Sequence, residues 1–336
     1  MPSITDVRGI STIAYGFMAS KALFAALNLD LFSRLGGGPK SLDALAAETG
    51  IASTRLLALL TACVSVGLLE NAPGGYANAP ASAAYLVRSA PAYFGDYYRL
   101  QIDRQLYPAL TRLDDALRGE RVDFYGLMED AVEAERFSAA QDAGSRGPAR
   151  VLAKLVDLDG CATLLDVGGG TGAFSVALCR RYPALRATIL DFPNVRPLAE
   201  RAIAAAGLGD RITFVGGDAL RTTWPAFQDV VVASYLLSAI AATNGDRLLA
   251  QAFRVLRPGG RLIVHDFMVE DDRGGPASAA LWLLAAIVMD PEAPSLTPGS
   301  VTTVMTRHGL TEVAVQDVIP GITKAVIGRK PTSAPA

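Results

Sequence analysis

Cysteine and histidine are scarce in this chain. Among 336 residues there are three cysteines and two histidines. Because Cys63, Cys161 and Cys179 are odd in number, far apart and each set among apolar residues, they predict neither a disulfide framework nor a metal site. We interpret them as small buried hydrophobic residues in a reducing compartment, and we therefore expect a cytoplasmic protein without a metal ion.

Strong charge and long hydrophobic runs are also missing. The formal net charge is −2 and no basic block occurs, which argues against nucleic acid as a partner. The longest largely apolar run, Ala277 to Met289, is much shorter than the roughly 20 residues of a membrane-spanning helix. The N-terminal residues lack the basic-then-apolar order of a signal peptide. We therefore expect no membrane partner.

The chain is long enough for roughly two domains. Residues 1–90 are predicted to be mostly helical, with two short helices, at 41–50 and from Ser53, followed by a turn-rich loop around residues 74–75. This order is winged-helix-like. The second short helix carries Arg55 among leucines, so we expect a packing or dimerisation role, and a DNA-binding regulator is the less favoured alternative.

The second part of the chain has a different pattern. Residues 91–147 mix aromatic and charged residues and predict helices that link two domains and contribute to a substrate pocket. Over residues 148–330, five short runs rich in Val, Ile and Leu alternate with helical patterns. Strands buried on both faces and separated by helices predict an α/β fold, a Rossmann-like, doubly wound parallel sheet. The tail, residues 331–336, is predicted to be disordered.

A glycine-rich turn follows the first of these runs, in the segment LLDVGGGTGAF at residues 164–174. Glycine is used where the backbone must turn tightly or let a ligand approach closely. In a doubly wound sheet, the first strand-to-helix turn is the usual cofactor contact. The spacing of Gly168, Gly170 and Ala173 also fits the loose dinucleotide fingerprint, so the glycines alone do not identify the cofactor.

Three aspartates near the ends of successive apolar runs indicate which kind of cofactor the turn binds. Asp166 precedes the turn, where a carboxylate would repel a pyrophosphate but can pair with an ammonium group. Asp191 ends the second run, placed to accept both hydroxyls of a ribose, and Asp218 ends the third, where it could accept an adenine amino proton. Acids at these places suit a cationic nucleoside without phosphate. S-adenosylmethionine is such a molecule.

The motif D-x-G-x-G-x-G at residues 166–172, with LDFP, GGDA and RVLRPGG, resembles the S-adenosylmethionine-dependent small-molecule O-methyltransferases of bacterial secondary metabolism and plant phenolics. The resemblance extends from about Ile13 to Arg329 and implies a homodimer with a winged-helix-like dimerisation domain. The cofactor-binding residues that we assign are Asp166, Gly168, Gly170, Gly172, Asp191, Phe192, Gly217, Asp218, Ala219 and Ser234.

The general base of the resembled family is replaced. Its histidine follows the fourth strand in a Leu-His-Asp setting, where this chain has Ser238 and Ala239, and a neutral serine is a poor base at pH 7. His308 ends a predicted helix, where we expect a structural role. His265, beside Asp266 at the end of the fifth run, is a candidate base or substrate contact. Strand alternation leaves open that it points into a helix layer instead.

The missing histidine widens the choice of reaction. We expect methylation of a small aromatic or carbonyl-containing metabolite at oxygen or carbon, with an amine as a further possibility. The N-terminal helices are expected to complete the partner's pocket in the homodimer. A family member that binds the cofactor but no longer methylates is an alternative. Candidate substrate contacts are Tyr98, Arg99, Phe124, Tyr235, Trp282 and Met289.

Overall fold

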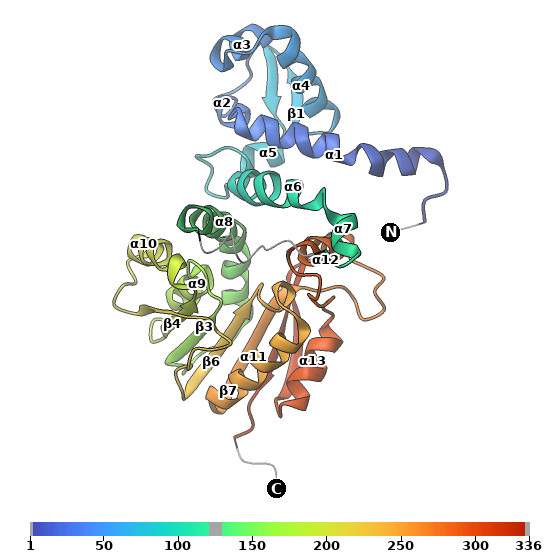
Figure 1. Cartoon of the computed structure of the whole chain (residues 1–336). Coiled ribbons are helices and arrows are strands. Elements are labelled where there is room, and N and C mark those ends of the chain that lie inside the picture. The colour runs from blue at the N-terminus through green and yellow to red at the C-terminus, as the bar shows by residue number, and fades with distance from the viewer. Residues whose placement is uncertain (1–2, 121–129, 333–336) are drawn as a thin grey trace. The chain divides into compact units, whose positions relative to one another are not determined.

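The computed structural model describes residues 3–120 and 130–332. The chain divides into two compact units, Met1–Tyr107 and Pro108–Ala336 (Figure 1). The composition predicts a boundary near Gly147, but helix α8 (Ala131–Leu155) runs through Gly147 and Pro148. Because residues of α8 on both sides of the predicted boundary are buried, the helix continues there and the units divide earlier in the chain.

The first unit consists of helices and one hairpin. The two short helices α3 and α4 are followed by an antiparallel pair of strands, as the sequence predicts. Ser41 caps α3 by accepting a hydrogen bond from the Ala44 N–H, and Gly50 ends this helix with a φ of 69°. A core that includes Leu45, Leu56 and Leu60 joins the elements. They are α1 (Val7–Asn28), α2 (Leu31–Arg34), α3 (Leu42–Thr49), α4 (Ser53–Ser65), β1 (Leu69–Ala72), β2 (Gly75–Asn78), α5 (Pro80–Tyr85) and the π-helix η1 (Tyr97–Leu106).

Helix α1 carries exposed apolar side chains along its N-terminal half. Val7, Ile10, Ile13, Tyr15 and Phe17 are each more than half exposed in this single chain. By length and composition alone, α1 could cross a membrane, as could the bent pair α3 and α4 taken together. An exposed apolar helix of this kind also suits contact with another protein surface.

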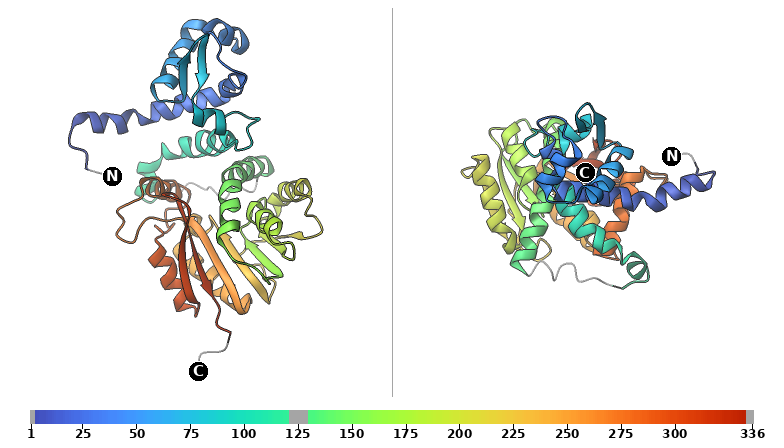
Figure 2. Two further views of the ribbon diagram at one scale, coloured as in Figure 1. Left: turned by 180° about the vertical axis from the view of Figure 1, so that it is seen from behind. Right: turned by 90° about the horizontal axis from the view of Figure 1, so that it is seen from above.

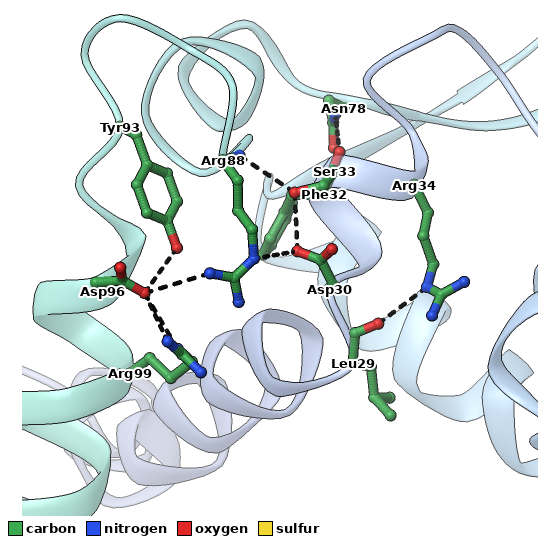
Figure 3. A network of polar contacts seen from close by, with 10 residues as sticks. All are labelled: Leu29, Asp30, Phe32, Ser33, Arg34, Asn78, Arg88, Tyr93, Asp96 and Arg99. Carbon is green, nitrogen blue, oxygen red and sulfur yellow. Dashed lines mark hydrogen bonds and ion pairs between the residues drawn. The ribbon is translucent and has the colours of Figure 1, made fainter.

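A polar network in the first unit connects the residues around α2 with the start of η1 (Figure 3). Arg88 donates from Nε to Asp30 at 2.9 Å, and its Nη1 lies 3.6 Å from Asp96. Asp96 also accepts from the Tyr93 hydroxyl at 3.0 Å and from Arg99 Nη2 at 2.8 Å. Arg99, a predicted substrate contact, is therefore engaged with a carboxylate of its own unit.

The second unit contains a seven-stranded sheet of order β5-β4-β3-β6-β7-β9-β8. The first five strands are parallel and correspond to the five predicted runs, while β8 and β9 pair antiparallel at one edge. The strands are β3 (Thr163–Val167), β4 (Arg186–Asp191), β5 (Ile212–Gly216), β6 (Gln228–Ser234), β7 (Leu256–Phe267), β8 (Thr311–Ile319) and β9 (Thr323–Arg329). The helices, after α6 (Tyr107–Leu110) at the junction of the units, are α7 (Leu113–Leu117), α8, α9 (Ala173–Arg181), η3 (Pro193–Val195), α10 (Arg196–Ala206), η4 (Leu237–Ala239), α11 (Ala242–Val255), α12 (Ala277–Met289) and α13 (Pro298–Arg307).

Helices cover both faces of this sheet (Figure 2). Alternate strand residues enter different cores: Leu164 and Val232 pack with α8, α9 and α10, whereas Leu165 and Val231 pack with α11 and α13. This alternation follows from the period of two in a strand and explains why the runs are apolar throughout. The predicted Rossmann-like, doubly wound α/β fold is confirmed.

The core on the α9 side yields a stability prediction. Leu178, fully buried in α9, packs under the sheet, so Leu178→Ala should lower the free energy of unfolding by about 2 to 5 kcal/mol. Urea unfolding followed by tryptophan fluorescence measures this, because both tryptophans, Trp224 and Trp282, belong to the second unit. Leu155→Ala, at a position 39% exposed, should cost less than about 1 kcal/mol. Equal losses in the two variants would contradict the packing described.

Candidate active site

The glycine-rich turn between β3 and α9 lies at the carboxyl edge of the parallel strands. Gly168, Gly170 and Gly172 have φ values of 65°, 56° and 87°, a left-handed region that other residues rarely adopt. A Cβ atom on Gly172 would lie 2.5 Å from Ile189 Cδ1, whereas one on Gly170 would meet nothing within 4 Å. The turn is therefore pressed against the sheet at Gly172 and open to a ligand at Gly170.

Asp166, the last aspartate before the turn, is fully buried beneath it. Its Oδ2 accepts hydrogen bonds from the Ser175 hydroxyl at 2.7 Å and the Ser175 N–H at 3.2 Å. Its Oδ1 has no hydrogen-bond partner in the described part of the chain. Burial raises the pKa of this carboxyl to about 6, against the lowering effect of Ser175. Asp166 therefore has no exposed surface in this structure, and its contacts with Ser175 connect the end of β3 to the first turn of α9.

Asp191 joins the glycine turn to the end of β4. Its Oδ2 accepts the Gly170 N–H at 2.7 Å and its Oδ1 accepts the Phe192 N–H at 2.7 Å. Burial raises the pKa of the Asp191 carboxyl, and the two backbone hydrogen bonds oppose that rise. The side chain remains half-buried, and each carboxylate oxygen has a second lone pair that a ligand hydroxyl can use.

The loop after β5 lies beside Asp191. The Gly217 N–H donates to the Asp191 carbonyl oxygen at 2.8 Å, and a Cβ on Gly217 would overlap Thr222. Asp218, the next residue, accepts the Leu220 N–H at 2.8 Å and pairs with the exposed Arg221 at 3.4 Å. The structure thus places the predicted residues of the second and third strand ends together. Phe192 is 40% exposed and Ala219 half-buried at the same edge.

His265 lies inside the sheet and is not exposed. Its Nδ1 is 2.7 Å from the Ser234 hydroxyl and its Nε2 is 3.0 Å from the Thr323 hydroxyl. Burial lowers the pKa of His265 to about 3, so the ring is neutral at pH 7. The side chain points into the helix layer, one of the two predicted alternatives, where its ring centroid is 5.2 Å from that of Phe174. A general base must reach its substrate, so this geometry argues against that role.

Ser238 contacts Asp266 rather than a histidine. Its N–H donates to Asp266 Oδ2 at 3.0 Å and its hydroxyl to Oδ1 at 2.6 Å. Ser238 is 8% exposed, Asp266 is fully buried, and burial raises the pKa of Asp266 to about 6. The side chain of Leu236 lies against the turn, since a Cβ on Gly168 would be 3.0 Å from its Cδ1. The segment that carries Ser238 is therefore adjacent to the glycine turn.

Two of the predicted substrate contacts belong to one group of rings. Phe267 stacks on Trp282 with centroids 4.2 Å apart and an angle of 11°, and Tyr235 lies 5.0 Å from Phe267. Met289 is half-buried at the other end of α12. In the first unit, Tyr98 packs edge-on against Phe94 and Tyr97. Phe124 lies outside the described residues.

One contact of the glycine turn has no signal in the sequence. The Thr171 hydroxyl donates to Asp142 Oδ1 of α8 at 2.7 Å, and Arg146 pairs with the other oxygen of that carboxylate. Asp142 lies far from the motif in the chain, so its approach depends on how α8 packs against the sheet. His308 is bound at 2.7 Å to Asp246, in agreement with a structural role. The described residues contain no group of three or more His, Cys, Asp or Glu side chains that could hold a metal ion.

Family models cover most of the chain. An O-methyltransferase domain matches residues 118–310, and an O-methyltransferase dimerisation domain matches residues 11–88. The dimerisation match falls within residues 1–90, and the O-methyltransferase match begins in the predicted linker and extends over most of residues 148–330.

Individual relatives agree with the family models. The chain is 33% identical over 337 residues to the tetracenomycin polyketide synthesis 8-O-methyl transferase of Streptomyces glaucescens, covering 97% of this chain and 98% of that protein. It is 31% identical over 291 residues to the L-tyrosine C(3)-methyltransferase of Streptomyces lavendulae, covering 82% and 79%. The crystal structure of human N-acetylserotonin methyltransferase in complex with S-adenosylmethionine superposes with a TM-score of 0.87 at 26% identity, covering 99% and 100%. The chain therefore belongs to the O-methyltransferase family and is an S-adenosylmethionine-dependent methyltransferase.

Proposed function

We propose that this enzyme methylates a hydroxyl group, or an activated ring carbon, of a flat aromatic metabolite. The observation that carries the proposal is the junction of Gly170 with Asp191, which joins an open glycine turn to a carboxylate at the next strand end. Two relatives support the acceptor class, since one is named for a polyketide and the other for L-tyrosine.

The residues of this edge fit S-adenosylmethionine. The donor set consists of carboxylates and backbone groups, which suits a cationic nucleoside and would repel a phosphate. Asp191 would hold the ribose, with Phe192 beside it, while Gly217, Asp218 and Ala219 would border the adenine. Gly168, Gly170 and Gly172 would follow the methionine part, which needs close backbone approach, and Ser234 would line the end of β6. The cofactor supplies a methyl group bound to a positively charged sulfur. The sulfur leaves as a neutral thioether, so it needs no further activation.

The remaining task of the protein is to hold an acceptor in line with that methyl group. Alignment of two reactants in a closed site can supply a large share of the rate enhancement. Tyr235, Trp282 and Met289 are proposed to bind the ring of the acceptor, because the stacked pair Phe267 and Trp282 offers an aromatic wall. Tyr98 packs against Phe94 and Tyr97 within the first unit and is assigned no acceptor contact. Arg99 is bound to Asp96 and is assigned no acceptor contact.

Self-association is the second part of the proposal. The matched dimerisation domain includes most of α1, whose apolar side chains are exposed in this single chain. A second copy of the chain would bury them, and the N-terminal helices would then complete the partner's pocket. Free cysteines, all buried, agree with a cytoplasmic enzyme.

Substitution of Asp191 tests the cofactor assignment. Asp191→Ala removes an acceptor for the ribose and leaves the Gly170 N–H without its partner, so affinity for S-adenosylhomocysteine should fall roughly 10-fold to 100-fold. Asp191→Asn keeps one acceptor and should give an intermediate loss. Isothermal titration calorimetry measures both, and the exposed Asp159→Ala serves as the matched control with unchanged affinity. Full affinity in Asp191→Ala would place the cofactor elsewhere.

Asp166 provides a pH prediction. Its pKa is about 6 in the folded chain against an ordinary 3.8, so the folded state binds more protons than the unfolded state between these pH values. This group's stabilising contribution is therefore full at acidic pH and is lost as the pH rises to 6. An amide does not ionise, so Asp166→Asn should raise the free energy of unfolding at pH 8 by up to about 3 kcal/mol relative to wild type, with a much smaller effect at pH 4.

Urea unfolding of Asp166→Asn at the two pH values measures this difference, with the exposed Asp159→Asn as control. We expect the same variant to bind S-adenosylhomocysteine more weakly, because the carboxylate orders the turn and α9 through Ser175. If Asp166→Asn changed the free energy of unfolding by the same amount at pH 8 and at pH 4, the ionised Asp166 would not be destabilising to the fold.

The dimer interface is tested at α1. Ile13 is 70% exposed in the single chain, so Ile13→Asp should leave the fold intact and convert the dimer to a monomer. Sedimentation velocity measures the oligomeric state. Phe227→Asp, at a position 81% exposed outside the matched dimerisation range, is the control and should remain dimeric. A monomeric wild-type protein, or a dimeric Ile13→Asp, would refute this interface.

A further inference from the structure

Ser238 and Asp266 form a buried pair beside the glycine turn. The Ser238 hydroxyl donates to Asp266 Oδ1 at 2.6 Å, a short charge-assisted hydrogen bond. The Ser238 N–H, at 3.0 Å, and the Phe267 N–H, at 2.9 Å, complete a fixed cradle for the carboxylate. Both chain histidines are engaged elsewhere, His265 with two hydroxyls and His308 with Asp246.

The carboxylate of Asp266 has no counter-charge among the described residues that contribute to its pKa. The groups that act on it are the side chain and N–H of Ser238 and the N–H groups of Leu237 and Phe267. Its sequence neighbour His265 faces the other side of the sheet. Lys324, its partner in the β7–β9 register, pairs with Asp317 and Glu270. Burial therefore raises the pKa of Asp266 to about 6.

Ser238 links this carboxylate to the carboxyl edge of the parallel strands, where the glycine turn lies. It belongs to η4, which contacts β7 and α12, the helix that carries Trp282. Leu236, two residues earlier, lies against Gly168 of the turn. The Ser238 hydroxyl directs its hydrogen atom at Asp266. The Ser238 oxygen therefore keeps lone pairs that can accept a hydrogen bond from the hydroxyl group of the substrate to be methylated. Asp266 is fully buried, so a ligand at this edge does not contact its carboxylate directly.

We propose that Ser238 and Asp266 form a proton relay that serves as the general base for methyl transfer. The inference rests on the proposed function. In one step, the acceptor O–H bond breaks and its proton moves to Ser238 Oγ, while the Ser238 proton moves to Asp266 Oδ1. The acceptor oxygen forms its bond to the methyl carbon as the methyl–sulfur bond breaks and the electron pair stays on sulfur. The products are the methyl ether, a neutral thioether and a protonated Asp266.

Ser238 is the catalytic residue of this relay and Asp266 the positioning residue that takes up the proton. A general base contributes about 100-fold to 10,000-fold to a rate. The rate enhancement from a general base depends on the acceptor. A phenol with a pKa of about 10 holds its proton at pH 7, whereas a strongly acidic phenol has already lost it. The relay therefore predicts a loss that grows as the acceptor becomes less acidic.

The test uses the full-length enzyme with labelled S-adenosylmethionine and naphthols of graded acidity. Ser238→Ala and Asp266→Asn should lower kcat at least about 100-fold for the least acidic naphthols and only a few-fold for those ionised at the assay pH. Wild-type kcat should fall with decreasing pH through an inflection near 6, and Asp266→Asn should lose that inflection. Affinity for S-adenosylhomocysteine should be unchanged in both variants.

Asp229→Asn is the matched control, because Asp229 is also buried but is the second residue of β6, at the opposite end of the parallel strands. It should alter stability without changing the dependence on acceptor acidity. Infrared difference spectra supply a readout without any acceptor: part of the wild-type carboxylic acid signal that titrates near pH 6 should be lost in Asp266→Asn, while the part from Asp166, whose pKa is also about 6, should remain.

The outcomes separate the relay from the function on which it rests. A uniform loss over all naphthols, or a carboxylic acid signal near pH 6 that Asp266→Asn leaves unchanged, overturns the relay while methyl transfer stands. Absence of label transfer by wild type over the panel overturns the proposed acceptor class, and the infrared titration then decides whether Asp266 has the protonation behaviour that the relay needs.

Discussion

The hydrogen bond from the Gly170 N–H to the Asp191 carboxylate is the interaction on which the site depends. It joins the turn after β3 to the end of β4, and the Gly217 N–H adds the loop after β5 through the Asp191 carbonyl. The bond forms because parallel strands end at one edge and because Gly170 adopts a positive φ. Three loops thereby become one surface of acceptors and backbone groups, and this surface suits a positively charged nucleoside.

The same edge contains two fully buried carboxylates that lack a cationic partner among the described contacts. Asp166 and Asp266 are held by serine hydroxyls and backbone N–H groups, and burial raises the pKa of each to about 6. Such groups reduce stability in their ionised form, since desolvation of a charge is unfavourable. They are therefore expected at positions where order or proton transfer is needed, as is common in active sites. Ser175 and Ser238 connect them to the turn and to η4.

The pattern of residues was sufficient for the sheet and for the grouping of the glycine turn with the neighbouring strand ends. Five apolar runs became β3 to β7, and Asp191, Asp218 and the glycines lie together where the motif predicts. The pattern could not decide the direction of His265, because strand alternation defines two faces and does not say which one meets the substrate. Neither could it show that Asp142 of α8 binds Thr171, since that contact depends on packing between distant segments.

The sequence by itself determined the α/β fold, the glycine turn with its neighbouring strand-end acids, and the family, because strand periodicity, positive-φ glycines and strand-end acids are local properties of the chain. Tertiary structure alone decided the protonation states and partners of the buried groups. Burial holds the pKa of His265 at about 3 and that of Asp266 at about 6, although the two residues are neighbours. Their side chains project from opposite faces of the sheet. The burial and hydrogen bonds on each face are established only when the helices pack against it.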